Sequence, residues 1–208
     1  MTYKINVVTK DKIRASKWSG GITNEIYIYP EGASYKERNF SWRISSATVE
    51  LDHSTFTDLP GIKRFITTLK GDMKLVHDNG PEIELKPFKI HDFDGGAKTE
   101  SYGRVTDFNL MIGNGAKGVL DVLAMVPGYS YDMPLEIVND KSSNFGRYCI
   151  AFYAPKGFTN INVDEEKYAL EEGEALILEL SKGDKLPKIT ISSLKIVELL
   201  VSIIAMES

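Results

Sequence analysis

The sequence is poor in the residues that form disulfides and metal sites. Its 208 residues include a single cysteine, Cys149, so an intrachain disulfide or a cage of several thiolates is excluded. Because apolar residues flank Cys149, we predict that it is a small buried hydrophobe. The three histidines, His53, His77 and His91, lie far apart in the sequence, unlike the closely spaced imidazoles of a typical metal site. We therefore predict surface histidines, no metal and no cofactor.

Strong positive charge and long apolar runs are also missing. The formal net charge is −4 and no run of basic residues stands out, which argues against a nucleic-acid partner. The first twelve residues, MTYKINVVTKDK, lack the apolar core of a signal peptide. The most apolar run, Ile196–Met206, contains Glu198 and is too short to span a bilayer. We expect a cytoplasmic, soluble protein without a membrane partner.

Helical periodicity is scarce, and Ile13–Trp18 is the main candidate, for one turn. Strand-like segments dominate and are separated at short intervals by Gly, Asn, Asp and Pro, which favours a β-sandwich or β-barrel over a βαβ fold. The expected strands are Lys4–Thr9, Thr23–Tyr29, Ser41–Val49, Arg64–Leu69, Met73–His77, Glu82–Leu85, Val119–Val126, Arg147–Tyr153, Ala175–Leu180 and Lys188–Ile204, the last as two strands or one bent strand.

A weak internal similarity relates the two halves of the chain. Leu69–Val76 resembles Leu170–Ile177 if one inserted residue is allowed, and each segment has a glycine at a turn between strands. A period of half the chain is what two similar barrels would give. Any two β-turns with acidic flanks would look alike, however, so this similarity leaves the repeat open.

Two arginines are the strongest candidates for a binding site. Period-two alternation in Trp42–Val49 puts Arg43 and Ser45 on one strand face, and Arg64 begins a later β-rich segment. A guanidinium stays charged and fits a carboxylate through two hydrogen bonds. The arginines therefore either bind a small anion or form structural pairs with buried carboxylates.

The segment before the first of these strands offers further candidates. Trp18 either lines a pocket wall or closes a barrel end, and Gly20-Gly21 is either a tight turn or a place where backbone N–H groups approach a ligand. By period two, Asn24 shares a face with isoleucines, where a carboxamide needs a hydrogen-bond partner. We therefore favour Asn24 over Glu25 as a ligand contact.

A third segment completes the predicted pocket. Asp107, Asn109 and Met111 alternate with apolar residues and so share a strand face. If this face lines the pocket, Asp107 holds an arginine in place and Asn109 contacts the ligand. Phe93 is expected to close one wall.

Several motifs in the first half of the chain, taken in order, resemble the HutD/Ves family of small cupin-like proteins. They are Trp18–Gly21 with Thr23–Ile26, WRIS-x-A at Trp42–Ala47, a phenylalanine with Leu59-Pro60-Gly61 and Arg64, L-x-G-D at Leu69–Asp72, Phe93–Gly96 and Asp107–Met111. The sequence departs from the family pattern at two loop-like places: Pro87–Phe93 lacks a second proline, and Asp52–Thr57 replaces the usual GPFS. The rest of the chain matches in general character.

The resemblance implies an all-β, cupin-like bicupin fold of two antiparallel β-barrels with little helix. We expect a boundary in the Gly113–Gly118 loop, with a first barrel at residues 1–113 that holds the pocket and a second at 114–208. The long apolar C-terminal strand either caps the second barrel or pairs with a symmetry mate, and of these a homodimer is favoured.

The expected function is binding of a small carboxylated metabolite without a metal. Resemblance to HutD implies a connection with histidine utilisation and a ligand such as urocanate or a formyl- or formimino-glutamate, whereas the Ves branch implies a stress response. One alternative is an isomerase or hydrolase on a cupin scaffold with Asp107 or Glu25 as general base. Another is a protein-interaction module, which an exposed apolar patch on Lys195–Met206 would favour.

Overall fold

The computed structural model describes residues 3–113, 115–139 and 144–207, which form two compact units. The pocket unit comprises Lys12–Ala116, and the C-terminal unit comprises Met1–Asp11 with Lys117–Ser208. The described residues are almost entirely β-strands joined by turns, with two short 3-10 helices at Lys10–Lys12 (η1) and Glu136–Asn139 (η2). The predicted all-β class is confirmed. No helix in this part of the chain has the length and apolar character needed to cross a membrane.

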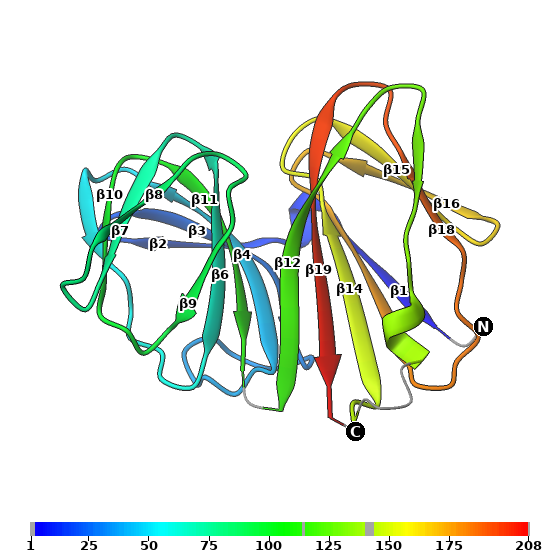
Figure 1. Ribbon diagram of the computed structural model, residues 1–208, viewed down its shortest axis with the longest axis horizontal. Coiled ribbons are helices and arrows are strands. Elements are labelled where there is room, and N and C mark those ends of the chain that lie inside the picture. Colours follow the sequence, from blue (N-terminus) through cyan, green and yellow to red (C-terminus); the bar gives the residue numbers. More distant parts are fainter. Residues whose placement is uncertain (1–2, 114, 140–143, 208) are drawn as a thin grey trace. The chain divides into compact units, whose positions relative to one another are not determined.

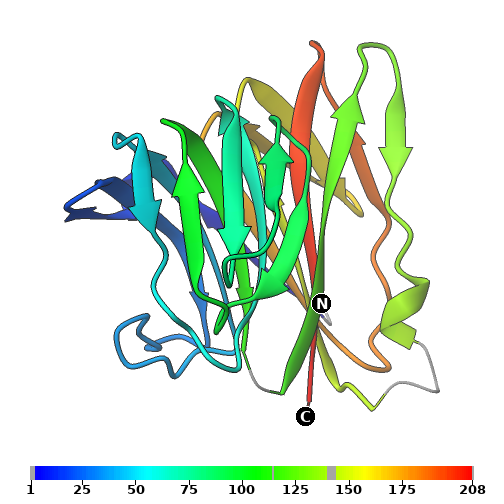
Figure 2. The same ribbon diagram turned by 60° about the vertical axis from the view of Figure 1, so that its left-hand side comes forward.

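Two antiparallel sheets build the pocket unit (Figures 1 and 2). The six-stranded sheet has the order β2 (Arg14–Trp18), β3 (Gly21–Tyr29), β4 (Trp42–Val49), β11 (Thr106–Ile112), β6 (Lys63–Lys70) and β9 (His91–Asp94). The four-stranded sheet has the order β5 (His53–Thr55), β10 (Thr99–Tyr102), β7 (Met73–His77) and β8 (Glu82–Leu85).

Strand β4 is central to the pocket unit because it is buried on both faces. Trp42 and Ile44 are fully buried on one face, and the alternate residues Arg43 and Ser45 are 4% exposed on the other. Burial of a charged face is costly unless polar partners compensate it. The apolar core between the two sheets includes Ile66 of β6 and Leu75 of β7.

The C-terminal unit also consists of two antiparallel sheets. Its five-stranded sheet has the order β1 (Lys4–Val8), β17 (Ala175–Ser181), β14 (Arg147–Tyr153), β19 (Val197–Met206) and β12 (Ala116–Met125). The four-stranded sheet has the order β13 (Ser130–Asp132), β18 (Ile189–Ser192), β15 (Phe158–Val163) and β16 (Glu166–Glu171).

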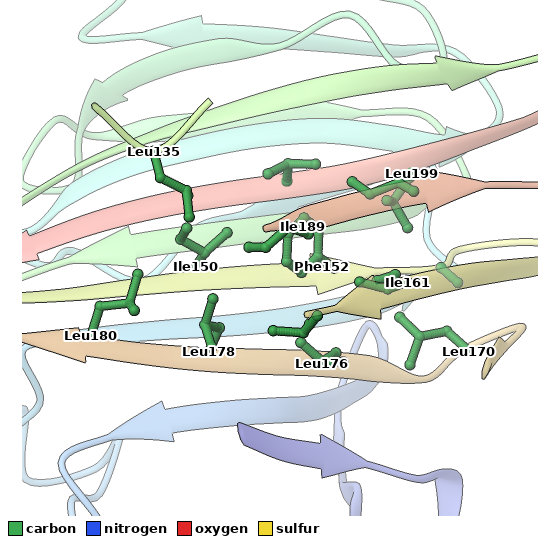
Figure 3. Packing of buried hydrophobic residues seen from close by; sticks show 14 of the residues in the cluster. Leu135, Ile150, Phe152, Ile161, Leu170, Leu176, Leu178, Leu180, Ile189 and Leu199 are labelled. Atoms are coloured by element: carbon green, nitrogen blue, oxygen red, sulfur yellow. The ribbon is translucent and has the colours of Figure 1, made fainter. Parts of the chain in front are cut away.

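Apolar side chains from both sheets of the C-terminal unit meet in one core. Ile150 and Phe152 of β14 and Leu178 of β17 point towards Ile161 of β15 and Ile189 of β18 (Figure 3). All five are at most 1% exposed, so the unit is held together chiefly by removing these side chains from water. Cys149 is 1% exposed, as predicted.

The structure differs from the predicted architecture in three respects. The strand ladders of the described residues form open sheets, so the expected pair of closed barrels is not confirmed. Strand β1 pairs with β17, so the first strand of the expected 1–113 domain belongs to the C-terminal unit. Residues 14–18 form β2 in place of the predicted helical turn, because they pair with β3 from Arg14 opposite Glu25 to Trp18 opposite Gly21.

Candidate functional site

A cavity of about 280 Å³ lies within the pocket unit. Three adjacent strands, β4, β11 and β6, supply its charged and amide side chains through Arg43, Asp107, Asn109 and Arg64. The other lining residues are Ser16, Trp18, Thr23, Tyr35, Ser45, Ala47, Val49, Thr55, Phe56, Thr57 and Met111. The cavity therefore combines polar groups with aromatic and aliphatic walls, as small-molecule sites do.

Strand register explains why the polar groups converge. Asn109 lies opposite Ser45, and Met111 lies opposite both Arg43 on β4 and Arg64 on β6. Because successive side chains point to opposite sheet faces, alternate residues of β4 and β11 line the cavity, while Ile44 and Leu110 point away from it. The two central strands and β6 thus bring Arg43, Arg64, Asp107 and Asn109 to a single buried face of the sheet.

The charge of Arg43 is satisfied within the protein. Its Nε donates a 2.8 Å hydrogen bond to Glu25 Oε2, and its NH1 donates a 2.9 Å hydrogen bond to Ser45 Oγ. The guanidinium also lies 4.5 Å from the centre of the Tyr35 ring. Glu25 is therefore the partner of Arg43, whereas the sequence analysis had considered Asp107 as the acid that holds an arginine in place.

Arg64 lies in a different environment. Its side chain is held between two aromatic rings, with the guanidinium carbon 4.6 Å from the centre of Phe56 and 5.1 Å from that of Phe93. Arg64 is 6% exposed, its Nε has no hydrogen-bond partner, and no described residue forms an ion pair with it. Burial lowers the pKa of Arg64 to about 10, against the opposing influence of Tyr35 and Asp107, so the group stays charged at neutral pH. A buried cation without an ion-pair partner is the main electrostatic feature of this cavity.

Asp107 is a buried acid of the cavity with a strongly raised pKa. It is 5% exposed, and burial raises its pKa to about 7, although the charge of Arg64 and the main-chain N–H of Ala47 act to lower it. Asp107 therefore changes protonation state near neutral pH. Next to it on the same face, the Oδ1 atom of Asn109 is buried without a hydrogen-bond partner.

Comparison with known proteins places the chain in a family. The family model HutD matches residues 10–193. The chain belongs to the HutD family. An uncharacterized 21.2 kDa protein from the hutC 3′ region of Pseudomonas putida is 34% identical over 99 residues. These residues are 46% of this chain and 50% of that protein, so the chain matches about half the length of this relative.

Solved structures support the same fold. A conserved protein of unknown function from Pseudomonas aeruginosa has a TM-score of 0.76 and 18% identity, over 99% of this chain and 100% of its own. HutD from Pseudomonas fluorescens has a TM-score of 0.72 and 20% identity, and the match covers 99% of this chain and 100% of that protein. YhhW from Escherichia coli, a pirin, has a TM-score of 0.66 and 11% identity, over 98% of this chain and 97% of its own. The fold is thus shared with HutD and pirin proteins.

Six of the eight predicted site residues of this HutD-family chain line the cavity. They are Trp18, Arg43, Ser45, Arg64, Asp107 and Asn109. Asn24 and Phe93 do not line it. Phe93 lies against the Arg64 guanidinium, and Phe56 forms the aromatic wall in its place.

Asn24 lies outside the cavity lining because it points to the other face of the sheet, opposite Ser46. The register between β3 and β4 shifts only after Glu25, so Ile28 lies opposite Arg43 and does not share a face with Asn24 as the alternation had predicted. Thr23 lines the cavity and Glu25 accepts a hydrogen bond from Arg43, so the face carrying these two residues is the cavity face. The geometry therefore favours Glu25 over Asn24 on the cavity face, and the ligand contact itself stays a prediction.

Packing within the chain accounts for the glycine pair near Trp18. A Cβ atom at Gly21, where φ is +151°, would lie 1.9 Å from the carbonyl oxygen of Thr48. At Gly20 it would lie 2.1 Å from the Trp18 ring. Both glycines allow β3 and Trp18 to approach their neighbours closely, so they do not require a ligand.

Two histidines that the sequence analysis placed separately on the surface form a pair. The Nε2 atoms of His77 and His91 are 2.9 Å apart, and Nδ1 of His77 lies 2.8 Å from Oγ1 of Thr99. Burial lowers the pKa of both imidazoles, so they are neutral above pH 7. Among the described residues, no group of three or more His, Cys, Asp or Glu side chains is arranged to hold a metal ion.

Proposed function

We propose that this HutD-family protein binds a small carboxylate in the cavity of the pocket unit, without a metal, in the cytoplasm. The observation that carries the proposal is Arg64, a buried guanidinium at the cavity with no ion-pair partner among the described residues. Burying such a charge is expensive unless an anion compensates it. The guanidinium fork is well suited to the two oxygens of a carboxylate.

Family membership supports a role linked to histidine utilisation. The P. putida relative comes from the hutC 3′ region, and the P. fluorescens HutD structure was determined in a formate condition. Urocanate and N-formyl-L-glutamate are therefore suitable probes, since each presents a carboxylate on a small organic body. The cavity volume of about 280 Å³ is just below the range of roughly 300–1,000 Å³ that is typical of small-molecule sites, so a small ligand is expected.

Carboxylates are expected to bind and their neutral amides are not. A thermal-shift screen with urocanate and N-formyl-L-glutamate, followed by calorimetry, measures this directly. The matched controls are urocanamide and the diamide of N-formylglutamate, which keep the shape but remove the charge that Arg64 needs. Equal affinity for acid and amide, or no binding by any carboxylate tested, would contradict the proposed function.

Asp107 supports an enzyme as the second candidate. A general base works best when its pKa is close to the working pH, and burial raises the pKa of Asp107 to about 7. Moreover, Arg43 pairs with Glu25, and no arginine in the described part of the chain forms an ion pair with Asp107. If Asp107 acts as a base, incubation of a bound carboxylate in D2O should give exchange or product signals by NMR, and these should disappear in Asp107→Asn. Unchanged spectra of urocanate and N-formyl-L-glutamate after prolonged incubation would argue for binding alone.

The protein-interaction alternative has less support from β19. Every residue of this strand is buried or half-buried, so the strand does not form the exposed apolar patch on which that alternative depended. The exposed apolar side chains Leu194 and Ile196 lie in the turn before it.

A further inference from the structure

We infer that the cavity takes up its carboxylate together with one proton, and that Asp107 holds this proton while its O–H group faces the ligand. The inference rests on the proposed function and adds a partner for Arg64 in recognition. The site then presents a guanidinium and a neutral carboxylic acid, both of which are hydrogen-bond donors.

The geometry provides the first step. Asp107 and Arg64 come from adjacent strands, β11 and β6, and line the same cavity. Neither side chain forms an ion pair within the described residues, and no described side chain donates a hydrogen bond to the Asp107 carboxyl group. Both groups are therefore available to a ligand that enters between them.

A count of charges provides the second step. Four groups matter around Asp107: Glu25 on β3, Arg43 on β4, Arg64 on β6, and Tyr35 in the segment between β3 and β4. Glu25 and Arg43 neutralise one another at 2.8 Å, and neutral Tyr35 contributes no charge. Arg64 and ionised Asp107 then sum to zero, so an incoming carboxylate would leave one uncompensated negative charge in a buried site. Protonation of Asp107 removes it.

The titration behaviour of Asp107 agrees with this count. In the free protein, burial already raises the pKa of Asp107 to about 7. A second negative charge nearby disfavours the ionised form further, so the pKa must be higher in the complex than in the free protein. Affinity for the carboxylate is then constant below pH 7. It falls as the pH rises from the Asp107 pKa of the free protein to the Asp107 pKa of the complex, and it is constant again at higher pH. Burial lowers the pKa values of His77 and His91, so above pH 7 both imidazoles are neutral and have no ionised proton to release to Asp107.

Protonation also changes what the site recognises. An ionised Asp107 would repel a carboxylate and accept a hydrogen bond, whereas the protonated acid donates one. The ligand oxygens can therefore be held by Arg64 from one strand and by Asp107 from the next. Asp107 becomes a specificity-determining residue that selects an anionic acceptor in the ligand.

Calorimetry with N-formylglycine tests the inference, because this probe carries the single carboxyl group that the charge count assumes and that group does not titrate between pH 6 and 9. At pH 8, titrations in buffers with different ionisation enthalpies should reveal uptake of about one proton per ligand, falling towards zero at pH 6. The dissociation constant should rise about tenfold per pH unit above pH 7.

Asp107→Asn keeps the shape of the side chain and a hydrogen-bond donor, so it should bind the probe with no proton uptake and little pH dependence. Asp52→Asn, an exposed acid in the same unit, should behave as wild type.

A measurement on the wild-type protein covers the case in which Asp107→Asn fails to fold. Carbon-13 NMR of the aspartate carboxyl groups should show one titration near pH 7 that moves upward by more than one unit when the probe saturates the site. Binding of the probe without proton uptake and without this movement overturns the inference and leaves the proposed function standing. Failure of the probe and of every other carboxylate to bind overturns both.

Discussion

Replacing Arg64 by alanine is expected to remove most of the affinity for a small carboxylate and to leave the protein folded. Removing one partner of a buried charge contact costs roughly 2–5 kcal/mol of binding, or about thirty-fold to several thousand-fold in the dissociation constant. The fold should survive, because Arg64 forms no ion pair with a described residue and the apolar core beside it is built by other side chains, such as Ile66, which is fully buried. Calorimetry with N-formyl-L-glutamate and thermal unfolding measure the two effects separately.

Two further variants sharpen this test. Arg64→Lys keeps the positive charge but loses the planar fork, so it should bind with intermediate affinity. Arg104→Ala removes an exposed arginine of the same unit, one that pairs with Asp52 at the surface, and should leave binding unchanged. If Arg64→Ala bound the probe as tightly as wild type, Arg64 would be a structural residue and the site would lie elsewhere.

Regular strands made much of the site predictable. β4 and β11 pair without a break from Thr48 opposite Thr106 to Trp42 opposite Ile112. Uninterrupted pairing keeps the period of two, and for this reason the sequence pattern placed Arg43, Ser45 and Asn109 on the same face correctly. The prediction used the alternation of residue types, and it held wherever no residue was inserted.

Irregular and long-range features were not predictable in this way. The bulge at Ile26 changes the face of every residue that follows it on β3. No residue type in this segment predicts a bulge. The hydrogen bond between His77 and His91 joins different sheets, and the contact of Tyr35 with Arg43 joins a loop to a strand. Such contacts depend on the tertiary arrangement, which the spacing in the sequence does not encode.

The weak internal similarity shows the same limit. Gly71 and Gly173 both have φ near +84°, so the predicted turns are real. However, Gly71 connects β6 of a six-stranded sheet to β7 of a four-stranded one, whereas Gly173 connects β16 of a four-stranded sheet to β17 of a five-stranded one. The chain thus passes between large and small sheets in opposite directions at the two glycines. The similarity reflects a shared turn conformation, since glycine tolerates positive φ, and the two segments do not occupy equivalent places.

Replacing Glu25 by alanine is expected to destabilise the protein, in contrast to Arg64→Ala. The Arg43 side chain is 5% exposed and its Nε donates to Glu25 at 2.8 Å, so loss of the carboxylate leaves a buried guanidinium without its counter-charge. Breaking a buried pair in this way costs about 3–5 kcal/mol, and we expect a value near 3 because Glu25 is 20% exposed and water can partly replace it. Urea unfolding of both proteins measures the difference.

The double variant Glu25→Leu/Arg43→Met distinguishes a lost pair from lost packing. It removes both charges while keeping apolar volume, and buried pairs replaced in this way often retain their stability. We therefore expect the double variant to recover most of the loss seen in Glu25→Ala. Glu82→Ala serves as a matched control, because it breaks a surface pair with Lys74 at the same 2.8 Å distance and should have a much smaller effect. If Glu25→Ala were as stable as Glu82→Ala, the charge of Arg43 would not depend on Glu25. Arg43 would then be a second arginine available to the carboxylate, and the charge count that assigns a proton to Asp107 would no longer hold.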